Sequence, residues 1–249
     1  LALGVEEAGV AYLNLGTSMV CGVTVGEYRT SPAFRTLVGV RSHTYVLETV
    51  LNAAAYLSSW AVREFGGGDL ASLEASAADV PIGAEGLLTL PYWNAAQTPY
   101  WDPLARGAVV GWHGRHTAAH LYRSILEGVA LELRLQLGEL ESAVGTSITE
   151  LRAVGGGARS ALWTQIVADA TGRDVVVMSD GEVSAAGSAI LAHEYLGHAA
   201  ASLRWRVGHT ATPDRDGVAR YDSLYEPYRR LYPALRGVMT QLAETTAAM

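Results

Sequence analysis

Residues 150–160 read Glu-Leu-Arg-Ala-Val-Gly-Gly-Gly-Ala-Arg-Ser, a short β-like run followed directly by three glycines. Ser160 is a suitable N-cap for a helix that we predict to end at Thr171, with Gly172 as its C-cap. Glycine lets a backbone approach phosphate oxygens, and a helix N-terminus adds unpaired N–H groups and the positive end of its dipole. The stretch therefore favours contact with a phosphate or nucleotide, although a tight strand-to-helix turn has the same pattern.

A second glycine phrase lies near the start of the chain. Leu15-Gly16-Thr17-Ser18 separates an alternating run, 11–15, from an apolar run, 19–25, and predicts a β-hairpin with a polar tip. The hydroxyls and N–H groups of Thr17 and Ser18 can clasp a phosphate, but an ordinary β-turn has the same residues. Two such loops in one chain favour a nucleotide held between them.

The triple-glycine phrase also has a competing interpretation. Gly155-x-Gly157-x-x-Ser160 nearly matches the dinucleotide fingerprint, with Ser in place of the third glycine. Asp180 follows the next predicted strand, 174–178, where an acid that binds the ribose of NAD would stand. An NAD-dependent oxidoreductase with a Rossmann-like loop therefore stays open as an alternative.

The composition excludes several classes of protein. The 249 residues are 49% hydrophobic and carry a net charge of -7, which permits a sizeable core and argues against a nucleic-acid partner. All 18 basic residues are arginine, so a Walker-type phosphate loop and a Schiff-base mechanism, which both need lysine, are excluded. The chain also lacks the Gly-x-Ser-x-Gly elbow of hydrolases.

Neither a membrane segment nor a disulfide is expected. The chain has no apolar run of about 18 residues and no signal peptide. Cys21 is the single cysteine and lies in an apolar run, which predicts a buried thiol in a reducing compartment. We therefore expect a cytoplasmic location and no membrane partner.

Strands and helices alternate along the rest of the chain, which predicts an α/β fold. The predicted elements are a helix over 46–65, a surface excursion over 66–86, short strands at 86–90 and 108–112, a long helix over 117–144, a helix over 182–196, a charged loop over 201–216 and a terminal helix over 221–247 interrupted at Pro227 and Pro233.

Two groups of residues suggest chemistry but have simpler interpretations. His113, His116 and His120 are close together, yet no carboxylate or cysteine cluster lies near them in the sequence, so we predict no metal site. Asp102-Pro103 has the form of a catalytic acid, but a turn pinned by Arg106 is the better interpretation.

Aromatic and acidic residues of the same region are also ambiguous. Tyr92, Trp93, Tyr100 and Trp101 would suit a sugar by stacking, and they would equally suit a hydrophobic core. Glu127 and Glu132 of the long helix are interpreted as an N–H-capping or solvated pair.

Taken together, the phrases of this chain resemble the FGGY family of carbohydrate kinases, in order and spacing over nearly its whole length. The matching phrases are Gly16-Thr17-Ser18, Leu90-Pro91-Tyr92, Trp101-Asp102-Pro103-x-Ala105-Arg106-Gly107, Leu121-x-Arg123-x-x-Leu126-Glu127-Gly128 and Gly155-Gly156-Gly157-Ala158-Arg159-Ser160, with Trp163, Gln165, Ala168-Asp169 and Thr171-Gly172 after them. Within the family the chain is most similar to the xylulokinases.

The resemblance implies an actin-like ATPase, or ribonuclease-H-like, domain: a mixed sheet with helices on both faces. It implies ATP and Mg²⁺ as cofactors and transfer of a phosphoryl group to a sugar hydroxyl. Thr17, with Gly16 and Ser18, would contact the terminal phosphates, and Gly111 would approach them. The residues that would hold the nucleotide near its ribose and adenine are Gly155, Gly156, Gly157, Ala158 and Ser160.

The resemblance further implies that residues 1–249 are the C-terminal, nucleotide-binding half of a two-domain kinase. In this division 1–200 form the core, and 201–249 form a loop and the terminal helix. The family's catalytic base is an Asp just ahead of the Gly-Thr-Ser strand, and neither Glu6 nor Glu7 matches it. We therefore expect the base and the sugar-binding N-terminal domain to lie outside this chain, and the chain alone to be inactive.

Two points stay open at this stage. The N-terminal domain and a small sugar are the expected partners, and a homodimer is compatible with the sequence. A non-catalytic sensor built on a kinase fold is the second alternative, since such a protein would keep the nucleotide phrases and lack the base.

Overall fold

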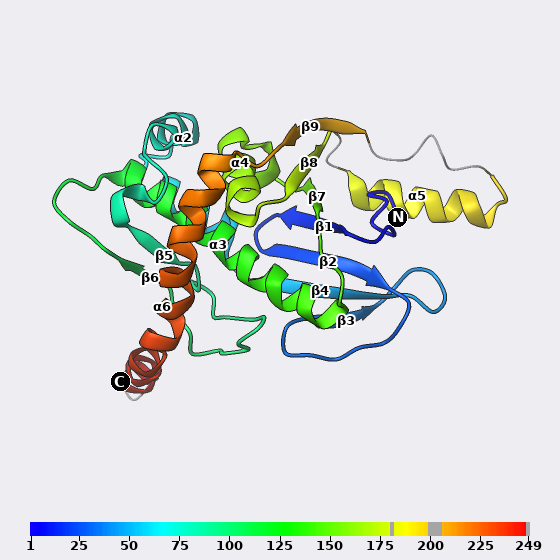
Figure 1. Ribbon diagram of the computed structural model, residues 1–249, viewed down its shortest axis with the longest axis horizontal. Coiled ribbons are helices and arrows are strands. Elements are labelled where there is room, and N and C mark those ends of the chain that lie inside the picture. Colours follow the sequence, from blue (N-terminus) through cyan, green and yellow to red (C-terminus); the bar gives the residue numbers. More distant parts are fainter. Residues whose placement is uncertain (180–181, 199–205, 248–249) are drawn as a thin grey trace.

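The computed structural model describes residues 1–179, 182–198 and 206–247, and a seven-stranded mixed sheet forms its centre (Figure 1). The strand order is β3-β4-β2-β1-β7-β8-β9. β1 pairs with β7 and β7 with β8 in parallel, whereas the other neighbours are antiparallel. The strands are β1 (Val10–Leu15), β2 (Met19–Val25), β3 (Arg35–Val38), β4 (Tyr45–Leu51), β7 (Glu150–Val154), β8 (Asp174–Met178) and β9 (Val207–Ala211).

The helices surround this sheet, and a separate hairpin pairs β5 (Leu88–Leu90) with β6 (Ala108–Val110). The helices are α1 (Ala55–Phe65), α2 (Leu70–Ala78), α3 (Ala118–Val144), α4 (Ala161–Thr171), α5 (Val183–Tyr195) and α6 (Arg215–Ala247), with short 3-10 turns η1 (Ala84–Gly86) and η2 (Gly157–Arg159). Among the described residues, no helix has the length and apolar character needed to cross a membrane.

Alternation along β1 gives the sheet two buried faces. Ala11, Leu13 and Leu15 are fully buried in the larger core, where α3 and α4 pack over the sheet. Val10 points the other way and joins a smaller cluster that includes Val176 of β8 and Val183 of α5. Figure 1 shows α5 beside the N-terminal segment that completes this second face. The prediction of a mixed sheet with helices on both faces is confirmed.

Several local predictions are also confirmed. The hairpin β1–β2 turns at residues 16–18, and β7 runs directly into the triple glycine. Ser160 caps α4, because its Oγ accepts the N–H of Trp163 at 3.0 Å, and Gly172 ends the helix in the left-handed conformation. These features depend on neighbouring residues, which is why the sequence predicts them.

Residues 46–65 do not form one helix. β4 occupies 45–51 and pairs with β2 in register from Val25↔Tyr45 to Met19↔Leu51, and α1 begins only at Ala55. The valines of this segment fit a half-buried pleated surface, and the partner strand overrides the helical spacing of its apolar residues.

Two segments expected to be irregular contain regular elements. Residues 66–86 include α2, which buries Leu73 and Ala77 and packs against α3. Residues 201–216 include β9, which pairs with β8 and forms one edge of the sheet. Both elements are stabilised by partners far along the chain, and their own residues give only weak signals.

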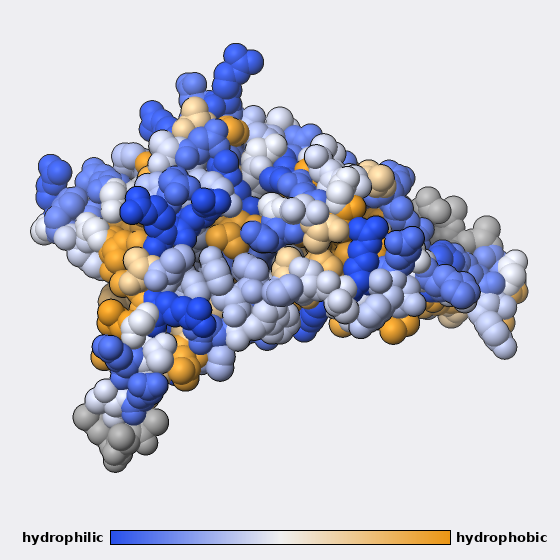
Figure 2. Space-filling view, turned by 60° about the horizontal axis from the view of Figure 1, so that its bottom comes forward, coloured by the Kyte–Doolittle hydropathy of each residue, from blue (hydrophilic) through white to orange (hydrophobic). Residues whose placement is uncertain are grey.

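The terminal helix is longer and more regular than predicted. α6 begins at Arg215 and continues through Pro227 and Pro233, so the predicted interruptions are wrong. Both prolines are exposed, and the carbonyl groups that they leave without an N–H partner can bind water. α6 packs against α4 and α3, and its far end protrudes from the body of the molecule (Figure 2, lower left).

Glu127 of α3 is buried and holds three elements together. It accepts hydrogen bonds from Arg123 Nε at 2.8 Å, from the N–H of Gly83 at 3.0 Å and from the hydroxyl of Tyr221 at 3.0 Å. Its interpretation as an N–H cap is confirmed, whereas the alternative of a solvated residue is wrong. Burial raises the pKa of Glu127, and the neighbouring Arg123 acts in the opposite direction.

Glu132, one and a half turns further along α3, is fully buried and not solvated either. Its carboxylate accepts the hydroxyls of Tyr92 at 3.0 Å and of Tyr228, from α6, at 2.6 Å. Burial raises the pKa of Glu132 to about 7, because two neutral hydroxyls do not replace the water that an ionised carboxylate loses.

The stability of the protein should therefore depend on the ionisation of Glu132. A folded-state pKa of about 7, above the ordinary 4.5, means that the folded chain holds the proton more tightly between these values. Protonation of Glu132 therefore stabilises the folded state fully below pH 4.5, and this contribution is lost as the pH rises to about 7. Relative to the wild type, Glu132→Gln should thus gain about 3 kcal/mol in free energy of unfolding between pH 4.5 and 8.

Urea unfolding of both proteins across this pH range measures the gain. Glu139→Gln is the matched control, because it removes the same charge from an exposed position of the same helix. A difference between wild type and Glu132→Gln that stays constant with pH would contradict the prediction.

Candidate functional site

The parallel pairing of β1 and β7 brings the two glycine phrases together. The strands are in register from Val10↔Glu150 to Asn14↔Val154, so the carboxyl ends of both strands lie on the same side of the sheet. A Cβ on Gly155 would lie 2.8 Å from the carbonyl oxygen of Leu15, and Gly155 has φ +95°. Only glycine fits at this position, and the tip 16–18 and the loop 155–157 are therefore neighbours.

Hydrogen bonds from the start of α1 fix the backbone of the hairpin tip. The N–H groups of Ala54 and Ala55 donate to the carbonyls of Thr17 and Gly16, each at 3.0 Å, and Ser18 Oγ donates to the carbonyl of Asn52 at 3.2 Å. These bonds fix the backbone of the tip. Thr17 is exposed, and within the described part of the chain its hydroxyl has no hydrogen-bond partner.

The triple-glycine loop presents free backbone donors. In the described residues, the N–H groups of Gly156 and Gly157 donate to no protein acceptor, whereas those of the next three residues close the turn η2. Gly156 is exposed, and a Cβ on it would meet nothing within 4 Å. The loop thus combines unpaired N–H groups with open space in front of the N-terminus of α4, which suits an anionic group.

Two other residues predicted for this loop are already engaged. Ala158 is buried, so its side chain contributes packing. Ser160 caps α4 and also hydrogen-bonds to the carboxylate of Glu74 from α2. Sequence reasoning missed Glu74 because the segment around it has no motif and was expected to be a surface excursion.

Gly111 lies on a different element. It follows β6, has φ +95°, and a Cβ on it would overlap the carbonyl oxygen of Gly86. Position 111 therefore requires glycine, because the backbone of η1 passes close to it. No hydrogen bond described here joins Gly111 to either loop, so its contact with a nucleotide stays a prediction.

The histidines near Gly111 have a carboxylate beside them after all. Among the described residues, Glu85, His113 and His116 offer ligand atoms within 4.8 Å of one another. However, Nδ1 of His116 accepts the N–H of His113 at 3.1 Å, and Nδ1 of His113 accepts the N–H of Arg115 at 3.3 Å. The lone pairs thus face main-chain donors and not a common centre, and we assign no metal here.

Asp102 holds a turn. Its carboxylate accepts the N–H of Leu104 at 2.8 Å and the hydroxyl of Tyr232 at 2.5 Å, and Arg106 donates to the carbonyl of Pro103 at 3.0 Å. Although burial acts to raise it, the pKa of Asp102 is lowered by these hydrogen bonds. The structural interpretation of Asp102-Pro103 with Arg106 is confirmed.

The aromatic residues of this loop serve the core more than a surface. Tyr92 is buried and donates to Glu132, and Trp93 packs against Trp60 with ring centroids 5.3 Å apart. Trp101 is the exposed member, and its Nε1 donates to the carbonyl of Pro32 at 2.7 Å.

Three remaining predictions concern acids and the cysteine. Glu6 and Glu7 precede β1, at the end opposite the hairpin tip, where Glu6 pairs with Arg41 at 3.0 Å. Asp180 lies outside the described residues. Cys21 is fully buried, as predicted, and burial raises the pKa of its thiol to about 12.

Known proteins match this chain as follows. A xylulose kinase from Bacillus subtilis is 29% identical over 97% of this chain and 50% of its own length. A glycerol kinase from Alkalilimnicola ehrlichii is 32% identical over 88% of this chain and 45% of its own length. The crystal structure of a xyloylose kinase from Brucella ovis has a TM-score of 0.83 and 30% identity, over 95% of this chain and 50% of that one. The chain thus spans about half the length of the curated relatives it matches.

The structural likeness confirms the prediction of an actin-like, ribonuclease-H-like fold. Residues 11–193, well over half of the chain, match the FGGY family of carbohydrate kinases, C-terminal domain. The two glycine loops, Glu127 and the Asp102 turn all lie inside this range. The chain belongs to the FGGY family of carbohydrate kinases and is of the kind that forms the C-terminal domain.

Proposed function

We propose that this chain is the nucleotide-binding half of an ATP-dependent sugar kinase. The observation that carries the proposal is the meeting of the Gly16–Ser18 tip with the Gly155–Gly157 loop, joined by the β1–β7 pairing. Within the described residues, one loop offers a hydroxyl without a partner, and the other offers N–H groups without partners before a helix N-terminus. Membership of a carbohydrate kinase family supports the same function.

The residues of the two loops fit a nucleotide in chemical character. Thr17 and the fixed tip would bind the terminal phosphates, and the N–H groups of Gly156 and Gly157 would bind oxygens closer to the ribose. The nucleotide would occupy the open space at Gly156, which a side chain at this position would fill. ATP, with Mg²⁺ on its phosphates, would supply the phosphoryl group that passes to a sugar hydroxyl.

The residues of this chain would act by positioning. The bonds from Ala54 and Ala55 hold the backbone of the tip, and so they fix the position from which the Thr17 side chain would reach the phosphates. Glu74, bonded to Ser160, is a carboxylate at the edge of the second loop, where it would accept a ribose hydroxyl. The catalytic base and the sugar-binding residues would come from an N-terminal domain, as the double length of the relatives suggests.

The proposed substrate is a pentulose such as xylulose. Relatives named xylulose kinase match nearly the whole chain, although a glycerol kinase matches at similar identity. The alternatives are an NAD-dependent oxidoreductase and a kinase-fold sensor without catalysis. No comparison supports either of them, and the fold around the loop is that of the kinases.

The first test is a calorimetric titration of the chain with Mg·ADP and, in parallel, with NAD. We expect Mg·ADP to bind and NAD not to bind, because the two loops offer separate groups for phosphates on adjacent strands. Binding of NAD without Mg·ADP would overturn the proposal in favour of the dinucleotide interpretation.

A second prediction concerns Gly156→Val. The branched side chain would occupy the open space where the nucleotide would lie, while φ -61° and ψ -39° suit valine. Affinity for Mg·ADP should fall at least about tenfold, or about 1.4 kcal/mol, with an unchanged thermal unfolding midpoint.

Two further variants complete that experiment. Gly237→Val is the matched control, because Gly237 of α6 is equally open and should keep full affinity. Gly155→Ala should instead lower the unfolding midpoint, since its Cβ would press on Leu15. If Gly156→Val binds Mg·ADP like the wild type, the loop does not hold the nucleotide.

A third prediction concerns Thr17→Val, which removes one exposed hydroxyl and keeps the shape of the side chain. A hydrogen bond to a charged group contributes about 1.5–3 kcal/mol, so affinity for Mg·ADP should fall about tenfold or more. Thr212→Val, at another exposed hydroxyl without a partner among the described residues, should have no effect. Equal affinities of the two variants would exclude Thr17 from the site.

A further inference from the structure

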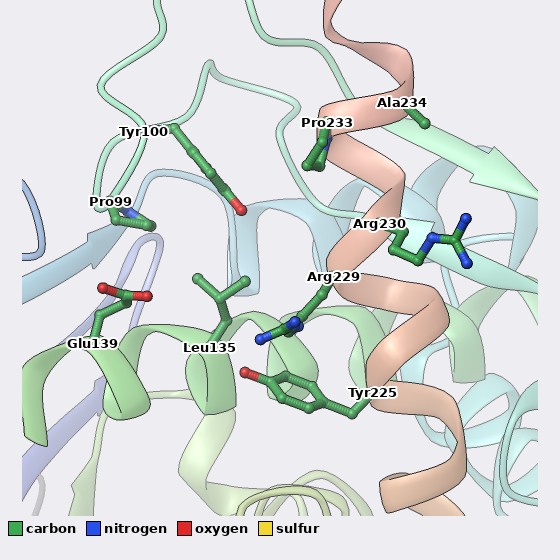
Figure 3. A pocket seen from close by; sticks show the side chains of 9 residues that line it. All are labelled: Pro99, Tyr100, Leu135, Glu139, Tyr225, Arg229, Arg230, Pro233 and Ala234. Atoms are coloured by element: carbon green, nitrogen blue, oxygen red, sulfur yellow. The ribbon is translucent and has the colours of Figure 1, made fainter. Parts of the chain in front are cut away.

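A second cavity lies away from the glycine loops, between α3, α6 and the segment around Pro99 and Tyr100. Its volume is about 590 Å³, which lies within the range of small-molecule sites. Figure 3 shows Leu135 of α3 between Tyr100 and Tyr225. It shares no residue with the two loops, and the proposed nucleotide chemistry does not use it.

The cavity presents polar groups that the protein leaves unused. Within the described residues, the hydroxyls of Tyr100 and Tyr225 and the carboxylate of Glu139 make no hydrogen bond or ion pair. In Figure 3 both hydroxyls point into the space, and Arg229 faces Glu139 across it. Arg229 pairs at 3.2 Å with Glu226, but both side chains are more than half exposed, so this pair costs little to rearrange.

The two tyrosines offer their hydroxyls and not their ring faces. The ring of Tyr100 packs against that of Tyr232, with centroids 4.2 Å apart and ring planes tilted by 38°. The guanidinium of Arg134 lies 4.3 Å from the ring centre of Tyr225. A planar base that needs free aromatic faces is therefore poorly served, whereas a ligand rich in hydroxyl groups is well served.

The charges set an orientation for such a ligand. A guanidinium at one side favours a phosphate, and a carboxylate at the other side accepts hydroxyl groups and repels a second anion. The apolar wall of Leu135 and Pro233 suits the carbon skeleton between them. A small polyol with an anionic group at one end matches all these features.

We propose that this cavity binds a sugar phosphate, with the phosphate on Arg229 and the hydroxyls on Tyr100, Tyr225 and Glu139. The binding is argued from the cavity alone. That the ligand belongs to the same chemical class as the kinase product, which would make this a product-sensing site, rests on the proposed function.

Calorimetric titration of the chain with D-xylulose 5-phosphate, without nucleotide, tests the proposal. Arg229→Gln should weaken binding about tenfold or more, because it removes the charged partner of the phosphate. Tyr225→Phe removes one hydroxyl, keeps the ring packing and should weaken binding about threefold to tenfold. Arg220→Gln, an exposed arginine of the same helix outside the cavity, is the control and should bind like the wild type.

Two further arms identify the recognised groups. D-xylulose and inorganic phosphate, each alone, should bind at least about tenfold more weakly than the sugar phosphate, because each engages one side of the cavity. Inorganic phosphate that binds equally well would overturn the assignment of a sugar phosphate. No detectable binding of D-xylulose 5-phosphate, or an unchanged affinity in Arg229→Gln, would overturn the site itself.

Gly156→Val separates this inference from the proposed function. It should lose Mg·ADP and keep the sugar phosphate, because Gly156 is not part of the cavity. Loss of both ligands would mean that the sugar phosphate enters the glycine loops, which overturns the inference. A wild-type chain that binds the sugar phosphate in the cavity but not Mg·ADP would contradict the proposed function and leave the binding site intact.

Discussion

The parallel pairing of β1 with β7 is the constraint on which the candidate site depends. The two strands are separated by more than a hundred residues, and only their register brings the Gly16–Ser18 tip to the triple glycine. The pairing in turn requires glycine at position 155, where the backbone of Leu15 leaves no room for a Cβ. Gly157 has a similar limit, since a Cβ there would lie 2.7 Å from the ring of Trp163. Two of the three glycines are thus needed by the fold, and only at Gly156 would a Cβ meet open space.

The helix α3 supports the rest of the arrangement from the opposite side of the core. It passes so close to β5 that a Cβ on Gly128 would overlap the carbonyl oxygen of Thr89. The two buried carboxylates of α3 need hydrogen-bond donors, because burying an unpaired carboxylate would cost several kcal/mol of folding free energy. Glu127 accepts the N–H of Gly83, the residue before η1, and the hydroxyl of Tyr221 from α6. Glu132 accepts the hydroxyls of Tyr92 and Tyr228. The terminal helix is therefore fixed by polar bonds as well as by apolar packing.

How much could be predicted from the sequence follows from how local each signal is. The hairpin, the strand into the triple glycine, the Ser160 cap and the long helix are specified by adjacent residues, and all were predicted correctly. β4 and β9 are strands because β2 and β8 lie beside them, information that a local pattern does not contain. The burial of Glu127 and Glu132, the approach of Glu85 to the histidines and the contact of Glu74 with Ser160 join distant segments in the same way. The residue types of the candidate site could thus be found from the sequence, and their surroundings could not.

The two loops divide the task of the candidate site according to how each is held. The N–H groups of Ala54, Ala55 and Tyr56, at the start of α1, donate to the carbonyls of Gly16 and Thr17, so this helix start stabilises the tip. The tip therefore offers the exposed side-chain hydroxyl of Thr17 on a fixed backbone. At α4 the cap is the side chain of Ser160, and the N–H groups of Gly156 and Gly157 have no acceptor among the described residues. That loop can offer backbone donors. Their hydrogen bonds need no particular side chain, but a Cβ at Gly156 would occupy the space in front of them. A hydroxyl on a fixed backbone, opposite two unpaired backbone amides, suits a chain of phosphates that ends near a ribose. The two loops therefore support a nucleotide site more strongly together than either does alone.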